Sequence, residues 1–173
     1  AAIAGVEAGI TAGLQPAEDG TRPAGISLTA DQVAALDAIR SDLASGRPMM
    51  RLIQGDVGSG KTAVAAVTMA VVAAHGHQSA LLAPTDLLAR QHAVTLARLL
   101  EPLGHSVVLM SGSATAAERR EARELALAPR RELLGDTRGL VFVGTHALIQ
   151  EDVTFHDLRL AIGIAHESAL PQP

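Results

Sequence analysis

Residues 54–62 read QGDVGSGKT, and this stretch decides which fold the chain can adopt. Its lysine, Lys61, is the only lysine in the sequence. All the other residues in the combined count of lysine and arginine are arginine. Four residues separate Gly55 from Gly60, and Lys61 and Thr62 follow directly. This spacing is typical of a phosphate-binding loop, where a compact ammonium fits around a phosphate chain better than a planar guanidinium does.

The backbone of this loop is expected to do most of the binding. Successive N–H groups of residues 57–62 would form an anion nest, and the helix that follows would add its dipole. Gly58 and Gly60 would supply positive φ angles. Lys61 would reach the β and γ phosphates of ATP, and the Thr62 hydroxyl would bind Mg²⁺, so both are candidate catalytic residues. The alternative is a plain glycine turn between a strand and a helix.

The composition limits the class of protein. The 173 residues are enough for one domain, and 48% hydrophobic with 1% aromatic residues predicts an aliphatic core. Without cysteine, disulfides and thiolate metal sites are excluded, and a cytoplasmic location is favoured. A net charge of −4 leaves no global basic surface for nucleic acid. We find no secretory signal and no apolar run long enough to span a membrane.

The chain is organised as a linker followed by an alternation of strands and helices. Residues 1–25 are rich in Ala, Gly and Pro and predict a linker, and residues 26–173 predict one lobe. Thr29 and Gln32 form a capping box that begins a helix, which ends near Gly46. Strands are expected at 51–54, 79–83, 106–110, 139–143 and 158–164. Helices are expected from the loop to about residue 74, at 86–100 and 115–128, with a short turn at 146–150. This order predicts an α/β fold, with a parallel sheet covered by helices on both faces.

Small and hydroxyl residues follow three of these strands. They are Pro84–Thr85, Ser111–Gly112 and Gly144–Thr145–His146. Functional loops of a parallel sheet lie at the carboxyl ends of its strands, so these turns should share one edge with the phosphate loop. Hydroxyl groups and exposed backbone N–H groups can bind a phosphodiester without basic residues. Each turn taken singly can instead be an ordinary helix cap.

Four segments resemble a known family in their order and spacing. LIQGDVGSGKT (52–62), APTDLLARQH (83–92), SGS (111–113) and VGTHALIQEDVTF (143–155) resemble motifs I, Ia, the following T-G-S-type element and Ib of the RecG branch-migrating DNA helicases. The resemblance covers residues 27–162. Transcription-repair coupling helicases share GDVG-x-GKT and GTH and stay an alternative, although APTDLLARQH and GTHALIQ favour RecG.

The resemblance implies a RecA-like P-loop NTPase fold and an ATP-dependent helicase that acts on forked or branched DNA in recombination and repair. It implies that Gln32, within LTADQ, contributes to the adenine site. The implied nucleotide-binding residues are Gln32, Gly55, Asp56, Val57, Gly58, Ser59, Gly60, Lys61 and Thr62. The implied nucleic-acid contacts are Pro84, Thr85, Arg90, Ser111, Gly112, Gly144, Thr145 and His146.

The sequence departs from the family after its last predicted strand. Family members continue into Asp-Glu-x-His, with the Asp expected near position 164 and the Glu near 165, where this chain has Ile164 and Ala165. Glu167 is the nearest carboxylate. The resemblance also implies a second RecA-like lobe and a wedge domain, which this sequence lacks. We therefore expect nucleotide binding without turnover, and a non-hydrolytic nucleotide-binding module is the competing interpretation.

Three other features have simpler explanations. His75 and His77 could be metal ligands, but an exposed turn is favoured. Residues 118–124 read ERREARE, which favours a solvated helix with i,i+4 ion pairs over a nucleic-acid face. His92 could contact DNA or cap its helix.

Overall fold

The computed structural model describes residues 28–128, 139–150 and 153–165. The predicted linker at 1–25 and Glu167 lie outside the described residues. The chain divides into two compact units, Ala1–Thr68 and Met69–Pro173. Helix α3 (Lys61–Ala74) runs across the boundary between them.

The first unit contains helix α2 and the phosphate loop. Helix α2 (Ala30–Ala44) begins with the predicted capping box. The Thr29 hydroxyl accepts from the Gln32 N–H at 3.3 Å, while the Gln32 side chain accepts from the Thr29 N–H at 2.9 Å. The helix ends before Gly46, whose φ of 69° is left-handed. Both ends of this helix are therefore set by local sequence, as predicted.

The strand predicted at residues 51–54 is absent from the described structure. Residues 49–56 have no regular secondary structure, and Met50 and Leu52 are exposed. The prediction was wrong because a strand is stabilised by its neighbours, and the β preference of Leu and Ile cannot replace a ladder partner.

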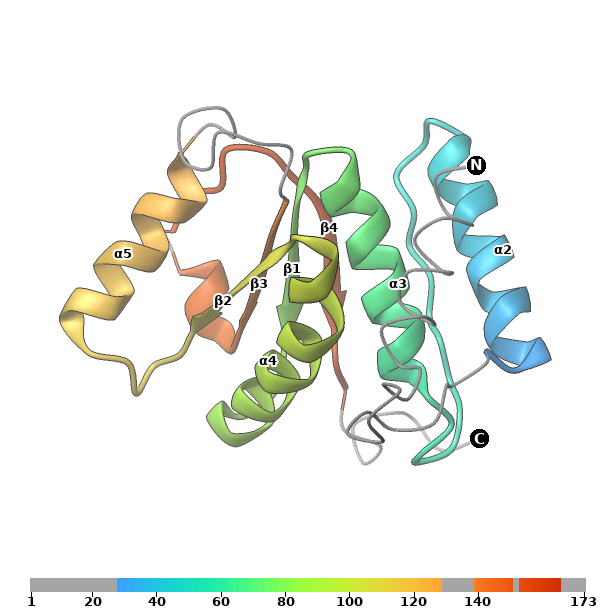
Figure 1. Ribbon diagram of the computed structural model, residues 1–173, viewed down its shortest axis with the longest axis horizontal. Helices are drawn as coiled ribbons and strands as arrows, with labels where there is room; N and C mark the ends of the chain where they lie inside the picture. The colour runs from blue at the N-terminus through green and yellow to red at the C-terminus, as the bar shows by residue number, and fades with distance from the viewer. Residues whose placement is uncertain (1–27, 129–138, 151–152, 166–173) are drawn as a thin grey trace. The chain divides into compact units, whose positions relative to one another are not determined.

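The second unit contains a four-stranded parallel sheet with the order β2-β3-β1-β4 (Figure 1). Its strands are β1 (Gln78–Leu82), β2 (Ser106–Met110), β3 (Leu140–Gly144) and β4 (Leu158–Gly163). Each lies within one residue of its predicted range. The two central strands, β1 and β3, pair from Ser79 with Val141 to Leu82 with Gly144.

Helices and short turns complete the second unit. Helix α4 (Asp86–Leu100) is followed by the short 3-10 helix η1 (Glu101–Leu103), and α5 (Ala116–Leu127) follows β2. The short helix η2 (His146–Ile149) follows β3. Helix α5 begins with a second capping box, formed by Thr115 and Glu118. Within the described ranges, no helix is long and apolar enough to cross a membrane.

The core lies on both faces of the sheet. On one face Ala80 and Phe142 pack with Ala122 and Ala126 of α5 and with Leu148 of η2. Phe155 meets Phe142 edge-on, with 5.1 Å between the ring centroids.

Leu81 and Val143, which follow Ala80 and Phe142 in their strands, are also buried. Their side chains point to the other face, because successive side chains of a strand alternate between the two faces. Helix α4 lies in front of the sheet in Figure 1 and buries Ala89, Leu96 and Leu100. Both faces are therefore covered, as predicted for a parallel sheet.

Candidate nucleotide and nucleic-acid sites

The phosphate loop has the backbone that its glycines predict. Gly58 has a φ of 85° and Gly60 a φ of 80°. The Ser59 N–H donates to the Asp56 carbonyl at 3.1 Å, which closes the turn, and the loop ends at the first residue of α3. The first N–H groups of a helix have no acceptor within it, so this end of α3 offers donors to an anion.

Lys61 is held by the loop itself. Its ammonium donates to the carbonyl of Gly55 and, at 2.8 Å, to the carbonyl of Asp56. The side chain is exposed, and Thr62 beside it is half-buried. The ammonium is therefore folded back onto the loop, and among the described residues its partners are two neutral carbonyls, which anionic phosphate oxygens can replace with stronger bonds. Asp56, Val57 and Ser59 are exposed around it.

Gln32 connects helix α2 to the phosphate loop. Its Oε1 accepts from Thr29, and its Nε2 donates to the Ser59 carbonyl at 2.9 Å. A Cβ added to Gly60 would collide with this Nε2. Glycine is favoured at position 60 by its φ of 80°, whereas the Gln32 amide, at the end of a flexible side chain, would have to move to admit a Cβ. Gln32 keeps one N–H and one lone pair for a further partner such as an adenine ring.

No carboxylate stands at the expected metal-anchoring position after β4. Ile164 follows the strand directly, and its N–H donates to the Leu82 carbonyl at 2.8 Å. Ile164 and Ala165 thus lie at the carboxyl edge of the sheet, beside the end of β1. The two side chains are apolar and can neither hold a hydrated Mg²⁺ nor orient a water molecule.

The three predicted nucleic-acid loops lie at one edge of the sheet. Pro84–Thr85 follow β1, Ser111–Gly112 follow β2, and Thr145–His146 follow β3, and these strands are parallel neighbours. The structure thus brings the three segments together, as the sequence predicts.

Burial divides these residues into two groups. Pro84, Thr85, Arg90, Gly112 and His146 are exposed, whereas Ser111, Gly144 and Thr145 are buried. The Thr145 hydroxyl has no hydrogen-bond partner among the described residues.

A Cβ on Gly144 would strike the Met110 carbonyl, so close packing between β3 and the end of β2 explains this glycine. The Thr85 hydroxyl accepts from the Leu88 N–H at 3.3 Å and caps α4, which is the alternative raised for these turns. His92 lies in the middle of α4 and does not cap it; burial lowers its pKa.

Asp86 is a residue that sequence reasoning missed. It lies in the first turn of α4 and accepts hydrogen bonds from the Ser111 hydroxyl at 3.0 Å and from the Ser113 N–H at 3.1 Å. Hydrogen bonds from the Ser113 and Ser111 side chains lower its pKa. The only signal in the sequence was an acid at a helix N-terminus, which is common and does not indicate a partner 25 residues away.

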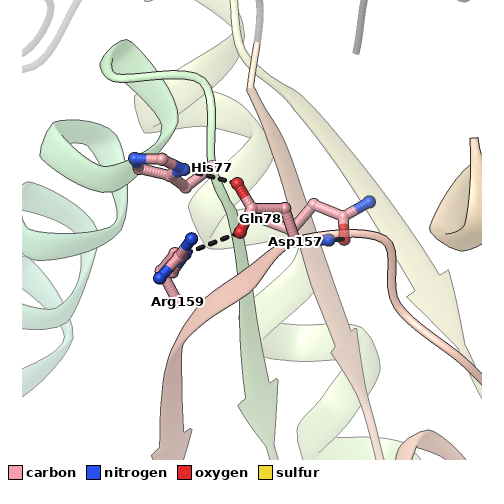
Figure 2. A network of polar contacts seen from close by, with 4 residues as sticks. All are labelled: His77, Gln78, Asp157 and Arg159. Atoms are coloured by element: carbon pink, nitrogen blue, oxygen red, sulfur yellow. Dashed lines mark hydrogen bonds and ion pairs between the residues drawn. The ribbon is translucent and has the colours of Figure 1, made fainter. Parts of the chain in front are cut away.

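A second polar network lies at the opposite, amino edge of the sheet. Figure 2 shows His77 and Arg159 pointing at the two carboxylate oxygens of Asp157, at 2.7 and 2.6 Å. Gln78 accepts from the Asp157 N–H at 3.0 Å and donates to the Ala126 carbonyl at 2.9 Å. Hydrogen bonds from His77 and then Arg159 lower the pKa of Asp157. This network ties β4 to β1.

The histidines do not form a metal centre in the part of the chain that the structure describes. The predicted turn is present, because α3 ends at Ala74 and Gly76 has a φ of 84°. His77 is bonded to Asp157, and no group of three or more metal-ligating side chains occurs in the described ranges.

A parallel sheet with the three predicted nucleic-acid loops at one edge, in a chain that carries the sequence motif of a phosphate-binding loop, is typical of a RecA-like helicase lobe. Residues 29–162 match the family of DEAD/DEAH box helicases, and the chain belongs to that family. The predicted fold class is therefore confirmed.

Among individual proteins, the chain is similar to the ATP-dependent DNA helicases RecG. It is 45% identical over 152 residues to RecG of Treponema pallidum, covering 84% of this chain and 21% of that protein. It is 44% identical over 135 residues to RecG of Bacillus subtilis, covering 78% of this chain and 19% of that protein. The chain thus spans about a fifth of the length of the curated relatives it matches.

A solved structure supports the same relationship. The fold is similar to a structure of RecG bound to a three-way DNA junction, with a TM-score of 0.67 and 37% sequence identity. The match covers 79% of this chain and 18% of that chain. The resemblance to RecG predicted from four motifs is confirmed.

Proposed function

We propose that this chain is the ATP-binding motor lobe of a RecG-like DNA helicase, and that the polypeptide as given binds nucleotide without meaningful turnover. The observation that carries the proposal is the loop at 55–62, with two glycines at positive φ and an exposed ammonium held only by carbonyl groups. A simple glycine turn does not require a lysine folded back onto its own loop.

The residues of the loop fit a nucleotide. Lys61 would exchange its bonds to Gly55 and Asp56 for bonds to phosphate oxygens, which are charge-assisted and stronger. The Thr62 hydroxyl, near the start of α3, would be a ligand of Mg²⁺. When bound, Mg²⁺ would offset the negative charge of the phosphates. Gln32 already contacts the loop and would hold the adenine through its remaining donor and acceptor.

DNA is the proposed partner of the loops that follow β1, β2 and β3. Their exposed residues, Pro84, Thr85, Arg90, Gly112 and His146, would contact the sugar–phosphate backbone. Ser111, Gly144 and Thr145 are buried and would support these contacts. The acidic chain predicts weak, salt-sensitive binding. One solved relative is bound to a three-way DNA junction. The proposal extends to forked or branched DNA as the partner, to a second RecA-like lobe and a wedge domain in a longer chain, and to a cytoplasmic location.

Hydrolysis is not supported by the residues after β4. Positions 164 and 165 carry Ile and Ala where the family places Asp and Glu, and neither side chain can assist an in-line attack by water. Positioning and acid–base assistance are worth about a hundredfold to ten-thousandfold each. Membership of the family favours a helicase, whereas Ile164 and Ala165 favour a lobe that binds nucleotide without hydrolysing it.

The test compares nucleotide binding with phosphate release in one preparation. We expect titration calorimetry to detect Mg-ADP binding, and phosphate release from ATP to stay at background with and without single-stranded DNA. DNA-stimulated turnover of about one per second, abolished by Lys61→Ala, would contradict the proposed lack of hydrolysis. Absence of any nucleotide binding would contradict the assignment of the loop.

A further inference from the structure

The loop that follows β2 is organised around a carboxylate. The Asp86 Oδ2 accepts from the Ser111 hydroxyl at 3.0 Å and from the Ser113 N–H at 3.1 Å, and the two serine hydroxyls lie 2.7 Å apart. The Ser113 N–H also approaches the Ser111 hydroxyl, at 3.2 Å. An ionised carboxylate surrounded by donors in this way fixes the path of residues 111–113.

This contact crosses the end of the central strand β3. Asp86 follows β1 and Ser111 follows β2, and β3 lies between these strands in the sheet. The residues nearest the crossing are buried, with Ser111 1% and Thr145 4% exposed. The hydrogen bonds that Asp86 accepts therefore join the loops after β1 and β2 across the end of β3.

Two arginines from different helices contact this loop from outside. Arg90 of α4 donates to the Ser113 hydroxyl at 3.0 Å, and Arg119 of α5 donates to the Gly112 carbonyl at 3.1 Å. Both side chains belong to exposed residues. A guanidinium has five N–H donors, so each arginine keeps donors for an anion.

The charges around the loop are balanced. Besides the two guanidinium groups and Asp86, Glu118 lies near enough to Arg90 to interact with it electrostatically. Glu118 is otherwise occupied by Thr115, whose N–H and hydroxyl donate to it at 2.7 and 2.8 Å. With two cations and two anions, the cluster has no net charge, so an anion would be recognised by directed hydrogen bonds rather than by a long-range field.

We propose that Arg90 and Arg119 together bind one phosphodiester of DNA over residues 111–113, and that Asp86 is the positioning residue of this site. The proposal rests on the proposed function, since it names how the loop after β2 contacts DNA. It assigns DNA binding to Arg119, on a helix whose sequence favours a solvated surface over a nucleic-acid face. Asp86 acts through the loop and touches no DNA.

The contribution of Arg119 is tested by alanine substitution, with Arg120→Ala as the matched control. Arg120 is the next residue of the same helix, carries the same charge and pairs with Glu124 at 3.6 Å. In anisotropy titrations with a fluorescent single-stranded oligonucleotide at low salt, Arg119→Ala should weaken binding about threefold to tenfold. The slope of log K against log salt should fall by about 0.7, the loss of one contact. Arg120→Ala should change both quantities much less.

The positioning role of Asp86 is tested by whether DNA affinity falls or rises when the carboxylate is removed. Removal of a negative charge near DNA should tighten binding if electrostatics alone act, as expected for the control Glu121→Ala on α5. We expect Asp86→Ala to weaken binding about threefold or more instead, because the loop loses its anchor. Asp86→Asn should restore part of the affinity, since its amide oxygen still accepts from Ser113. Amide exchange at Ser113, measured by NMR, should accelerate in Asp86→Ala while that of α4 is retained.

Each outcome supports or overturns a stated part of the proposal. Equal or tighter DNA binding by Asp86→Ala overturns the positioning role, and equal effects of Arg119→Ala and Arg120→Ala overturn the arginine site. Both results leave the proposed function standing. If the wild-type chain binds nucleotide but no oligonucleotide at low salt, the DNA part of the proposed function fails and this site fails with it. If Asp86→Ala does not fold, the DNA affinities of Asp86→Asn and Arg119→Ala test the proposal instead.

Discussion

Lys61→Ala removes the only ammonium from the phosphate loop, and its effect on nucleotide binding can be estimated from the structure. Lys61 donates to the carbonyls of Gly55 and Asp56 in the free chain, so binding exchanges neutral acceptors for anionic ones. A hydrogen bond to a charged group contributes about 1.5–3 kcal/mol. We therefore expect a loss of about 2 kcal/mol or more, which is about a thirtyfold weaker Kd.

The assay is titration calorimetry with Mg-ADP, and Arg47→Ala is the matched control. Arg47 is an exposed cation in the same unit, so its removal changes the net charge equally without touching the loop. We expect Arg47→Ala to bind within about twofold of the wild type, because an exposed charge at a distance is screened. Thermal unfolding should show that Lys61→Ala remains folded. Equal affinity of Lys61→Ala and wild type would refute the reasoning, and would mean that the loop is only a turn.

Two further predictions concern stability. Gly60→Ala should lower the free energy of unfolding by about 1–2 kcal/mol, because a Cβ is strained at its φ of 80°. Gly163→Ala, where a Cβ meets open space, should be nearly neutral in denaturant titrations. The second prediction concerns the loss of folding stability at low pH. Asp157 has a lowered pKa in the folded state, so it binds fewer protons folded than unfolded at low pH. Its contribution is therefore complete above the unfolded value of about 3.9 and is lost as the pH falls through the folded pKa. Asp157→Asn should flatten this acid limb, and the control Glu121→Gln should preserve it; an unchanged limb in Asp157→Asn would contradict the role of the network with His77 and Arg159.

The parts of the fold that sequence predicts are those fixed by neighbours in the chain. The capping boxes at Thr29 and Thr115 place the starts of α2 and α5, because each cap and its partner are three residues apart. The alternation of buried strands with helices likewise predicts the parallel sheet. The segment at 51–54 contains Leu52 and Ile53 but has no ladder partner in the described structure, and no local pattern reveals such a lack.

For the candidate site, the sequence predicts which loops share one edge of the sheet but not the contacts within them. The residues that follow three strands were assigned to one edge because parallel strands place their carboxyl ends together. Which of them are exposed depends on packing between distant segments. Ser111 and Thr145 are buried, and the Ser111 hydroxyl donates to Asp86, which lies 25 residues earlier in the chain. A pair so far apart in one sequence leaves no periodic signal.

The central claim, that residues 55–62 bind the phosphates of a nucleotide, is tested most directly by an NMR titration of the backbone amides. Mg-ADP should shift the amide signals of residues 57–62 most strongly, because their N–H groups would become donors to phosphate oxygens. The amide of Gly104, which follows η1 before the start of β2, serves as the internal reference. Saturable shifts centred on Lys61 and Thr62 are the predicted result. Saturable binding that leaves residues 57–62 unshifted would contradict the account.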